Sequence, residues 1–203
     1  MRKKMRILAA ADLHGNSRKF KELAEQAERE NVDLVVLCGD ILGWVETKNI
    51  IKPFKDKNKR VLILPGNWDS FATVDFLAEL YGVRNIHGYS VKYDNIGFFG
   101  AGGAPGSPGE GKITERELMR SLEKAHKGLE GIEKKIRVTH MHPQGSKSEF
   151  SGFDGSKEVR RAVEKFKPDL LLHGHIHEAG GMEEKIGRTT VINVGREGKV
   201  IEV

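Results

Sequence analysis

Five short stretches of the sequence combine aspartate, histidine and asparagine in spacings that suit the binding of metal ions. Each stretch directly follows an apolar run, which predicts a buried β-strand. In open α/β sheets, ligands bind outside the carboxyl ends of the strands. Parallel strands would therefore deliver these side chains to one edge of a sheet. The five stretches are Asp12-Leu13-His14, Gly39-Asp40, Gly66-Asn67-Trp68-Asp69, Thr139-His140-Met141-His142 and His173-Gly174-His175-Ile176-His177.

The spacing within two of these stretches has a physical reason. Residues i and i+2 of an extended segment point the same way, so Asp12 and His14 can reach one ion together. The same holds for His175 and His177. An isolated Asp-x-His or Gly-Asp is a weak signal, with surface or capping roles as its ordinary explanation. Three imidazoles within five residues after an apolar strand have little packing value, so the joint pattern favours a metal site.

Glycines stand directly before three of the candidate ligands. Gly39 precedes Asp40, Gly66 precedes Asn67, and Gly174 precedes a histidine. A residue without a Cβ atom lets the backbone turn tightly at the end of a strand. Carboxylate, imidazole and carboxamide groups together suit Mn, Fe, Zn or Ni better than Mg or Ca, which prefer shells made only of oxygen.

The first third of the chain alternates strand and helix patterns. This order argues for parallel strands with helices packed outside them. Ser17 is the expected N-cap of the first helix. The expected strands are 7–11, 33–38 and 60–64, and the expected helices are 18–30, 47–55 and 71–81.

The rest of the chain is richer in strands. Residues 101–111 contain so much glycine and proline that we expect a loop, which either folds over the substrate or is a plain surface connection. An α/β beginning and a β-rich end indicate two sheets packed together under helices. The expected strands are 84–87, 90–93, 97–100, 136–139, 170–173 and several within 181–203, and the expected helices are 114–127 and 157–166.

Length and composition restrict the class of protein. A chain of 203 residues fits one compact domain spanning 1–203. The single cysteine, Cys38, excludes an internal disulfide, and no apolar run is long enough to span a membrane. The basic start, 1–6, leads into too short an apolar stretch for a secretory signal, so we expect a cytoplasmic location.

The charge balance is mildly basic. The formal net charge is +5, which suits phosphorylated small molecules or nucleotides as substrates. Lysines and arginines alternate with glutamates along the predicted helices rather than clustering, so a nucleic-acid partner is not expected. The sequence does not decide whether the chain forms a homo-oligomer.

The five stretches together resemble the calcineurin-like metallophosphoesterase family. That family's pattern is D-x-H, G-D, G-N-H-D/E, a histidine at a strand end, and G-H-x-H, in this order. The resemblance extends from residue 12 to residue 177 and implies a four-layer αββα sandwich of two mixed β-sheets flanked by helices. It also implies two divalent transition-metal ions, with manganese favoured.

The resemblance implies a role for each candidate ligand. The first metal would be bound by Asp12, His14 and His177, and the second by Asn67, His140 and His175. Asp40 would bridge both ions and set their spacing. The residue pattern alone supports the same seven ligands but does not assign them to individual ions. His142 is an alternative to His140 as the metal ligand in this stretch. We prefer His140 because it directly follows the strand and matches the family's position.

Trp68 departs from the family pattern. The family often has a histidine there, which contacts the scissile phosphate and protonates the leaving group. An indole has no titratable nitrogen near neutral pH, so it can do neither. Asp69 then loses its usual partner and is expected only to brace the turn. His142 is a candidate substitute for the missing acid, so the catalytic residues we expect are Asp40, Asn67 and His142.

The function that follows is a binuclear metal-dependent phosphoesterase. Hydrolysis of phosphodiester bonds, with a metal-bridging hydroxide as the nucleophile, is the first expectation. Diesters with good leaving groups suffer least from the loss of an acid. A phosphomonoesterase or a nucleotide pyrophosphatase of the same fold is the alternative within the enzyme class. A non-catalytic scaffold on this fold is the alternative from another class, and metal content would distinguish it.

Overall fold

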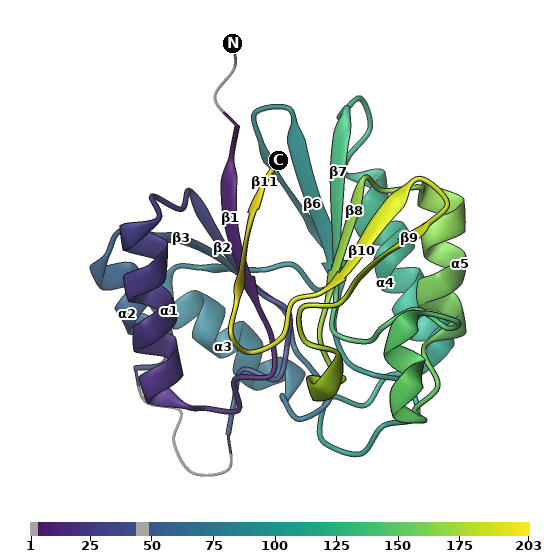
Figure 1. Ribbon diagram of the computed structural model, residues 1–203, viewed down its shortest axis with the longest axis horizontal. Coiled ribbons are helices and arrows are strands. Elements are labelled where there is room, and N and C mark those ends of the chain that lie inside the picture. The colour runs from purple at the N-terminus through teal and green to yellow at the C-terminus, as the bar shows by residue number, and fades with distance from the viewer. Residues whose placement is uncertain (1–3, 44–48) are drawn as a thin grey trace.

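Two β-sheets packed face to face form the centre of the molecule (Figure 1). The computed structural model describes residues 4–43 and 49–203. In the first sheet the strand order is β11-β1-β2-β3-β4; β1 to β4 pair in parallel, and β11 is antiparallel to β1. Its strands are β1 (Arg6–Ala10), β2 (Leu34–Leu37), β3 (Arg60–Ile63), β4 (Arg84–Asn85) and β11 (Lys199–Glu202).

The second sheet has the order β5-β6-β7-β8-β10-β9. The four central strands are parallel, and the two edge strands, β5 and β9, run antiparallel to their neighbours. Both sheets are therefore mixed, as the sequence predicted. The strands are β5 (Ser90–Tyr93), β6 (Ile96–Ala101), β7 (Lys134–Thr139), β8 (Leu170–His173), β9 (Glu183–Ile186) and β10 (Thr189–Asn193).

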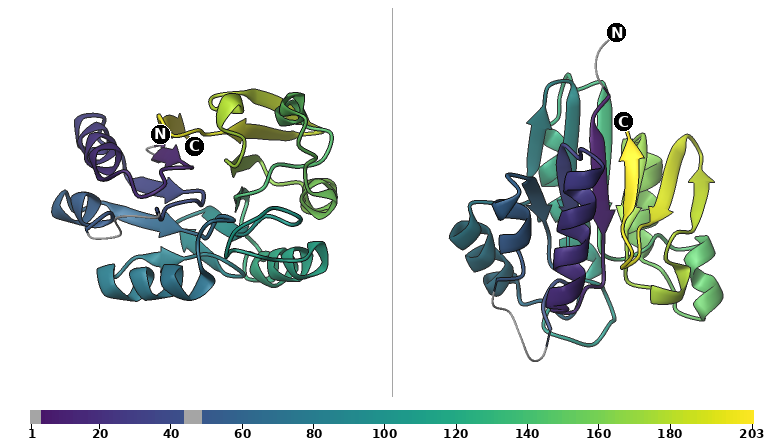
Figure 2. Two further views of the ribbon diagram at one scale, coloured as in Figure 1. Left: turned by 90° about the horizontal axis from the view of Figure 1, so that it is seen from below. Right: turned by 60° about the vertical axis from the view of Figure 1, so that its left-hand side comes forward.

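Helices cover the outer face of each sheet, which confirms the predicted αββα sandwich. Figures 1 and 2 show α1, α2 and α3 beside the first sheet, and α4 and α5 beside the second. None of the helices in the described part of the chain is long and apolar enough to cross a membrane. The helices are α1 (Ser17–Arg29), α2 (Lys52–Asp56), α3 (Phe71–Tyr81), α4 (Glu115–Lys127) and α5 (Lys157–Phe166), with the short 3-10 turns η1 (Lys147–Ser151) and η2 (His177–Ala179).

The parallel strands are apolar on both faces because both faces are covered. In β1, Leu8 packs into the cluster beneath α1 to α3, whereas Ile7 and Ala9 pack into the cluster between the sheets. Alternate side chains of a strand point to opposite faces, so each central strand contributes to two cores. This arrangement explains why the strands read as continuous apolar runs in the sequence.

The predicted elements agree with the structure except at some ends. Helices α3 and α5 have the predicted bounds. The first helix is capped by Asn16 rather than by Ser17, because the Asn16 side chain accepts a hydrogen bond from the Lys19 N–H at 3.1 Å. The helix predicted at 47–55 is the shorter α2, with Pro53 in its first turn, where a missing N–H costs nothing; residues 47 and 48 lie outside the described residues.

Candidate metal centre

The predicted ligands converge where the two sheets meet. The expectation that one edge of one sheet carries them was wrong in one respect: β1, β2 and β3 belong to the first sheet, and β7 and β8 to the second. The carboxyl ends of both sets of parallel strands open on the same space. The first sheet supplies Asp12, His14, Asp40 and Asn67, and the second supplies His140, His175 and His177.

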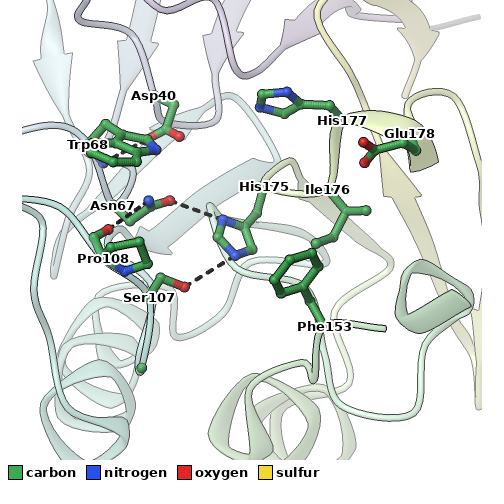
Figure 3. Close-up of a pocket in the computed structure, with 11 residues that line it drawn as sticks. Asp40, Asn67, Trp68, Ser107, Pro108, Phe153, His175, Ile176, His177 and Glu178 are labelled. Carbon is green, nitrogen blue, oxygen red and sulfur yellow. Dashed lines mark hydrogen bonds between the residues drawn. The ribbon is translucent and has the colours of Figure 1, made fainter. Parts of the chain in front are cut away.

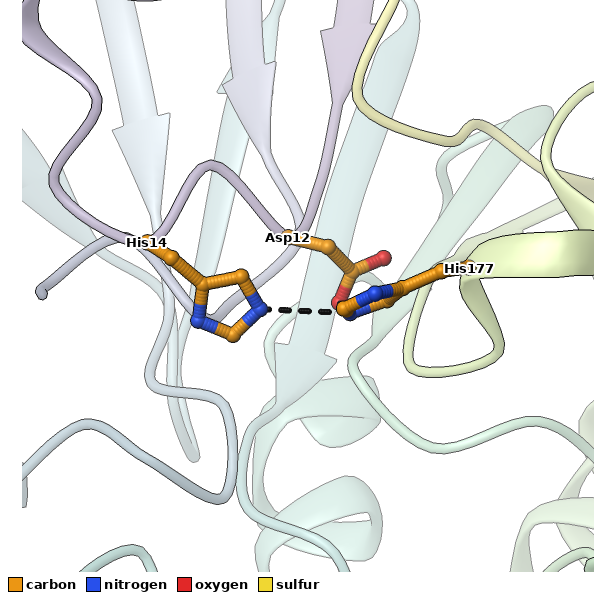
Figure 4. Close-up of side chains that lie close together, drawn as sticks. All are labelled: Asp12, His14 and His177. Atoms are coloured by element: carbon orange, nitrogen blue, oxygen red, sulfur yellow. Dashed lines mark hydrogen bonds and ion pairs between the residues drawn. The ribbon is translucent and has the colours of Figure 1, made fainter.

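Asp12, His14 and His177 form one compact group of donors (Figure 4). Their ligand atoms all lie within 4.8 Å of one another. The two Nε2 atoms of His14 and His177 are 3.2 Å apart, and His177 Nε2 lies 3.8 Å from Asp12 Oδ1. Two imidazole nitrogens and a carboxylate oxygen thus point at one small volume.

Asp40 lies between this group and the buried His140. Its Oδ2 atom is 3.8 Å from His14 Nε2 and 3.5 Å from His140 Nε2. Asp12, Asp40 and His140 form a second set of donors within 4.8 Å of one another. A carboxylate in this position is able to contact cations on both sides.

Asn67 and His175 complete the buried end of the centre. The Asn67 Oδ1 atom lies 3.0 Å from His140 Nε2 and 3.0 Å from His175 Nδ1, and these two nitrogens are 3.2 Å apart. The Asn67 Nδ2 group donates a hydrogen bond to the Pro108 carbonyl at 2.9 Å (Figure 3). This bond turns the amide so that its oxygen faces the imidazoles.

These residues fit divalent cations. The buried Asp12 Oδ2 atom has no hydrogen-bond partner, and a bound cation would satisfy it. His140 Nδ1 lies 2.9 Å from the Cys38 carbonyl, so Nδ1 carries a proton, and Nε2 would be the ligand atom once a bound cation displaces its proton. Mixed nitrogen and oxygen donors of this kind suit transition metals.

Opposite charges inside the centre shift the pKa values of two buried groups. Burial alone opposes ionisation, yet the attraction between Asp40 and His140 lowers the pKa of Asp40 to about 2 and raises the pKa of His140 to about 9. His175 behaves differently, because burial and the nearby His140 lower the pKa of His175 to about 3. Burial also raises the pKa of Asp12. The donors therefore form an interacting electrostatic unit.

Four of the candidate ligands have a left-handed backbone. The φ angles are 59° at Asp12, 45° at His14, 51° at Asp40 and 74° at His175. Such angles are uncommon outside glycine and carry a cost of order 1–3 kcal/mol each where the residue is strained. Backbone hydrogen bonds hold them: the Asp12 N–H donates to the Gly39 carbonyl at 3.0 Å, and the His14 N–H to the Asp40 carbonyl at 2.9 Å.

The three glycines before the ligands serve close packing more than turning. Gly39 has a φ of +90°, and a Cβ atom there would also lie 2.6 Å from His140 Nδ1. Gly66 and Gly174 have no left-handed φ. A Cβ atom at Gly66 would lie 2.0 Å from Asp40 Oδ1, and one at Gly174 would lie 2.3 Å from the Ala11 Cβ atom. A left-handed backbone angle is thus found only at Gly39.

Asp69 braces the loop that follows β3. It is fully buried and accepts hydrogen bonds from the backbone N–H groups of Gly66, Ile41 and Leu42 at 2.8 to 3.1 Å. Burial and the nearby Asp40 raise the pKa of Asp69 to about 6, although these donors favour its ionised form. The structural role expected for this residue agrees with its contacts.

The neighbouring Trp68 lies at the mouth of the centre. Its backbone N–H donates a hydrogen bond to Asp40 Oδ1 at 2.9 Å, and its side chain is 38% exposed. Figure 3 shows the indole beside Asp40. Trp68 therefore occupies a place at which it can contact a substrate without serving as an acid.

His142 does not line the cavity that Asp40, Asn67, His175 and His177 border. It is fully buried, its ring stacks on His175 at 6.0 Å between centroids, and its Nε2 atom lies 3.2 Å from the Phe153 carbonyl. Because a carbonyl only accepts hydrogen bonds, His142 Nε2 carries the proton in this contact, while His142 Nδ1 has no hydrogen-bond partner. His173 is likewise buried, at the end of β8. We find no geometric support for His142 as the acid.

A cavity of about 330 Å³ is bordered by Asp40, Asn67, His175 and His177. This main cavity of the centre also contains residues that the motifs did not indicate. Ser107 and Pro108 come from the glycine- and proline-rich loop, and the Ser107 hydroxyl lies 3.3 Å from His175 Nε2. Phe153 and Ile176 border it on the other side of His175 (Figure 3). The composition of the loop was a signal for Ser107 and Pro108, whereas no sequence signal indicated Phe153.

The comparisons with known proteins identify the family of the chain. Residues 5–179 match the calcineurin-like phosphoesterase family, so the chain belongs to that family. Members of the family are hydrolases of phosphoric esters and typically bind divalent metal ions. Among curated proteins, no sequence matches the chain.

Solved structures show the same fold at low sequence identity. The protein TT1561 of Thermus thermophilus is 17% identical, with a TM-score of 0.77, and the match covers 98% of this chain and 99% of that one. A protein described as a novel archaeal phosphodiesterase is 18% identical, with a TM-score of 0.56 and coverage of 98% and 100%. A dimetal phosphatase from Danio rerio is 12% identical, with a TM-score of 0.60 and coverage of 94% and 87%.

Proposed function

We propose that the protein is a binuclear metal-dependent phosphodiesterase acting on a phosphorylated small molecule or nucleotide. The observation that carries this proposal is the convergence of the seven predicted donors into two adjoining groups, with Asp40 between them. The dimetal phosphatase and the archaeal phosphodiesterase that share the fold support it.

The chain's own residues would hold two cations in this site. Asp12, His14 and His177 would bind the first, Asn67, His140 and His175 the second, and Asp40 both. When bound, such cations lower the pKa of water and neutralise charge on phosphoryl oxygens. Manganese is the metal we propose to test first, because the donor set mixes oxygen with nitrogen.

The expected preference for good leaving groups rests on Trp68. An indole beside Asp40 cannot protonate a leaving group, and the alternative acid, His142, does not border the cavity. General acid help is typically worth about 10²–10⁴-fold, so substrates whose leaving group departs without a proton are favoured. We expect kcat/KM for bis-p-nitrophenyl phosphate to exceed that for a dialkyl phosphodiester, because an alkoxide leaving group needs a proton and p-nitrophenolate does not.

The test is hydrolysis of bis-p-nitrophenyl phosphate with Mn²⁺ by the wild type and by Asp40→Asn. We expect a loss of about 10²–10³-fold or more in kcat, because the shared carboxylate is removed. Asp56→Asn, at an exposed aspartate paired with Lys52, is the matched control and should not change turnover. Unchanged turnover in Asp40→Asn would contradict the two-metal proposal. Metal content near zero after purification without chelator would favour a scaffold instead.

A further inference from the structure

Arg196 lies beside the exposed group of donors, in the turn between β10 and β11. Together with Asp12, His177 and Glu178 it lines a second cavity of about 290 Å³. Its Nη2 group donates a hydrogen bond to the Asp12 backbone carbonyl at 3.3 Å. Its position is thus next to the centre, although it follows the residues that match the family, 5–179.

The fold fixes the turn that carries Arg196. The Asn193 Nδ2 group donates to the Ile176 carbonyl at 2.8 Å, and the Asn193 Oδ1 atom accepts from the Gly195 N–H at 3.1 Å. The Ala11 N–H donates to the Gly195 carbonyl at 2.9 Å. These bonds join the turn to β1 and to the histidine segment after β8, so Arg196 is held at a defined distance from the candidate ligands.

The charge of Arg196 is not neutralised by the protein. Across the described ranges 4–43 and 49–203, no carboxylate lies within ion-pair distance of its guanidinium group. The neighbouring Glu197 pairs with Lys19 instead. An arginine is always charged near neutral pH and presents donors that suit phosphate oxygens.

Arg196 is also the one lysine or arginine among the described residues that line the three cavities around the centre. Carboxylates also line these cavities: Asp40 the main cavity, Asp12 the cavity at Arg196, Glu178 both of these, and Glu110 the third. Among the described residues that line these cavities, a second anionic group of a substrate therefore has Arg196 as its one lysine or arginine partner.

The cavity at Arg196 is separate from the place at which the scissile group would lie. It shares only His177 and Glu178 with the main cavity, which contains Asp40 and Asn67. A group that contacts Arg196 is thus displaced toward the Asp12 side of the centre. This position favours a contact between Arg196 and a part of the substrate other than the scissile phosphate.

We propose that Arg196 binds a second phosphate group of the substrate, so that the preferred substrate is a phosphodiester carrying a further phosphate. This inference rests on the proposed function, because it assumes that a phosphoester binds over the candidate metal centre. A phosphate held by a guanidinium group through charge-assisted hydrogen bonds gains affinity and orientation.

The experiment compares a matched pair of diesters with the Mn²⁺-loaded protein. Thymidylyl-thymidine and its forms phosphorylated at the 5′ or the 3′ end differ only in the extra phosphate. We expect the wild type to show a kcat/KM about ten-fold or more higher for one phosphorylated form, as one charged hydrogen-bonded contact would give. In Arg196→Gln this ratio should fall to about one, and Arg196→Lys should retain part of it. Arg188→Gln, at an exposed arginine paired with Asp169, should leave the ratio unchanged.

A binding measurement separates this inference from the proposed function. Calorimetric titration of thymidine 3′,5′-bisphosphate and thymidine 5′-monophosphate should give about ten-fold tighter binding of the bisphosphate, and Arg196→Gln should remove the difference. If the wild type hydrolyses no diester but this difference is found, the proposed function fails while the role of Arg196 stands. If the wild type shows no preference in hydrolysis and binding, or if Arg196→Gln leaves the ratios unchanged, the inference is overturned.

Discussion

The two ends of the candidate metal centre differ in burial. At one end, the side chains of His14 and His177 are 28% and 46% exposed. At the other end, His140 has no exposed surface, and Asp40 and Asn67 are almost fully buried. Both ends combine two imidazoles with side-chain oxygen donors, so the main difference between them is in their surroundings.

The surroundings also differ in how firmly they hold the donors. At the buried end, the Cys38 carbonyl orients His140, the Pro108 carbonyl orients Asn67, and Ser107 contacts His175. In the part of the chain that the structure describes, no comparable hydrogen bond holds the Nδ1 atoms of the two exposed histidines. The buried end is thus preorganised by the protein, whereas the exposed end depends more on the bound cation. Changes at the buried end should cost stability as well as activity.

The largest effect is expected for His140→Ala. In the metal-free protein this change leaves the Asp40 carboxylate buried without its charged partner, which typically costs about 3–5 kcal/mol of unfolding free energy. Urea denaturation with a chelator present, at pH 7, measures this loss. Activity should also vanish, because a proposed ligand is removed.

A double variant provides the control for that prediction. If an unpaired carboxylate is the cause, adding Asp40→Asn to His140→Ala should cost much less than it costs in the wild type. Equal costs in both backgrounds would show that the two side chains do not stabilise each other. A decrease of less than about 1 kcal/mol in the unfolding free energy of His140→Ala would contradict the proposed difference between the two ends.

His14→Ala should separate activity from stability. The side chain is partly exposed, so its removal should change the unfolding free energy by about 1 kcal/mol or less. We still expect a loss of about 10²–10³-fold in kcat/KM for bis-p-nitrophenyl phosphate, because charge stabilisation at the first ion is weakened. A stability loss as large as that of His140→Ala would contradict the comparison.

The pH dependence of stability tests a further buried histidine that is not a candidate ligand. Burial lowers the pKa of His173, at the end of β8, from 6.5 to about 3. Between these values the unfolded chain takes up a proton that the folded chain does not, so stability falls as the pH drops below 6.5. The slope from this group is at most about 1.4 kcal/mol per pH unit. His173→Asn should flatten the curve of unfolding free energy against pH, measured with chelator, and parallel curves would contradict this assignment.

The sequence predicted the donors of the centre but not its two environments. Strand ends and the spacing of Asp12 and His14 were visible as a pattern of residue types. Burial depends on which loops cover each end, and that follows from the tertiary fold. The loop with Ser107 packs over His175 only because β6 places it there, directly after Ala101.

Arg196 shows the same limit more sharply. It lies far from every motif in the sequence, in an ordinary turn between two predicted strands. It reaches the centre because β10 pairs in parallel with β8, which brings the end of β10 beside the histidine segment. A long-range strand pairing of this kind leaves no local pattern, so only the structure could indicate the residue.

Ser107→Ala should give the smallest effect and tests whether the loop contributes to the preorganised end. The Ser107 hydroxyl lies 3.3 Å from His175 Nε2, a long contact, so we expect metal affinity to weaken by about ten-fold or less, the lower end of the range for partners of ligands. Competition of Mn²⁺ with a fluorescent chelator measures this change. Ser151→Ala is a matched control, because that hydroxyl donates to the Ser148 carbonyl and not to a candidate ligand. Equal affinities in the wild type and Ser107→Ala would mean that backbone packing alone, including the Pro108 carbonyl, holds the buried end.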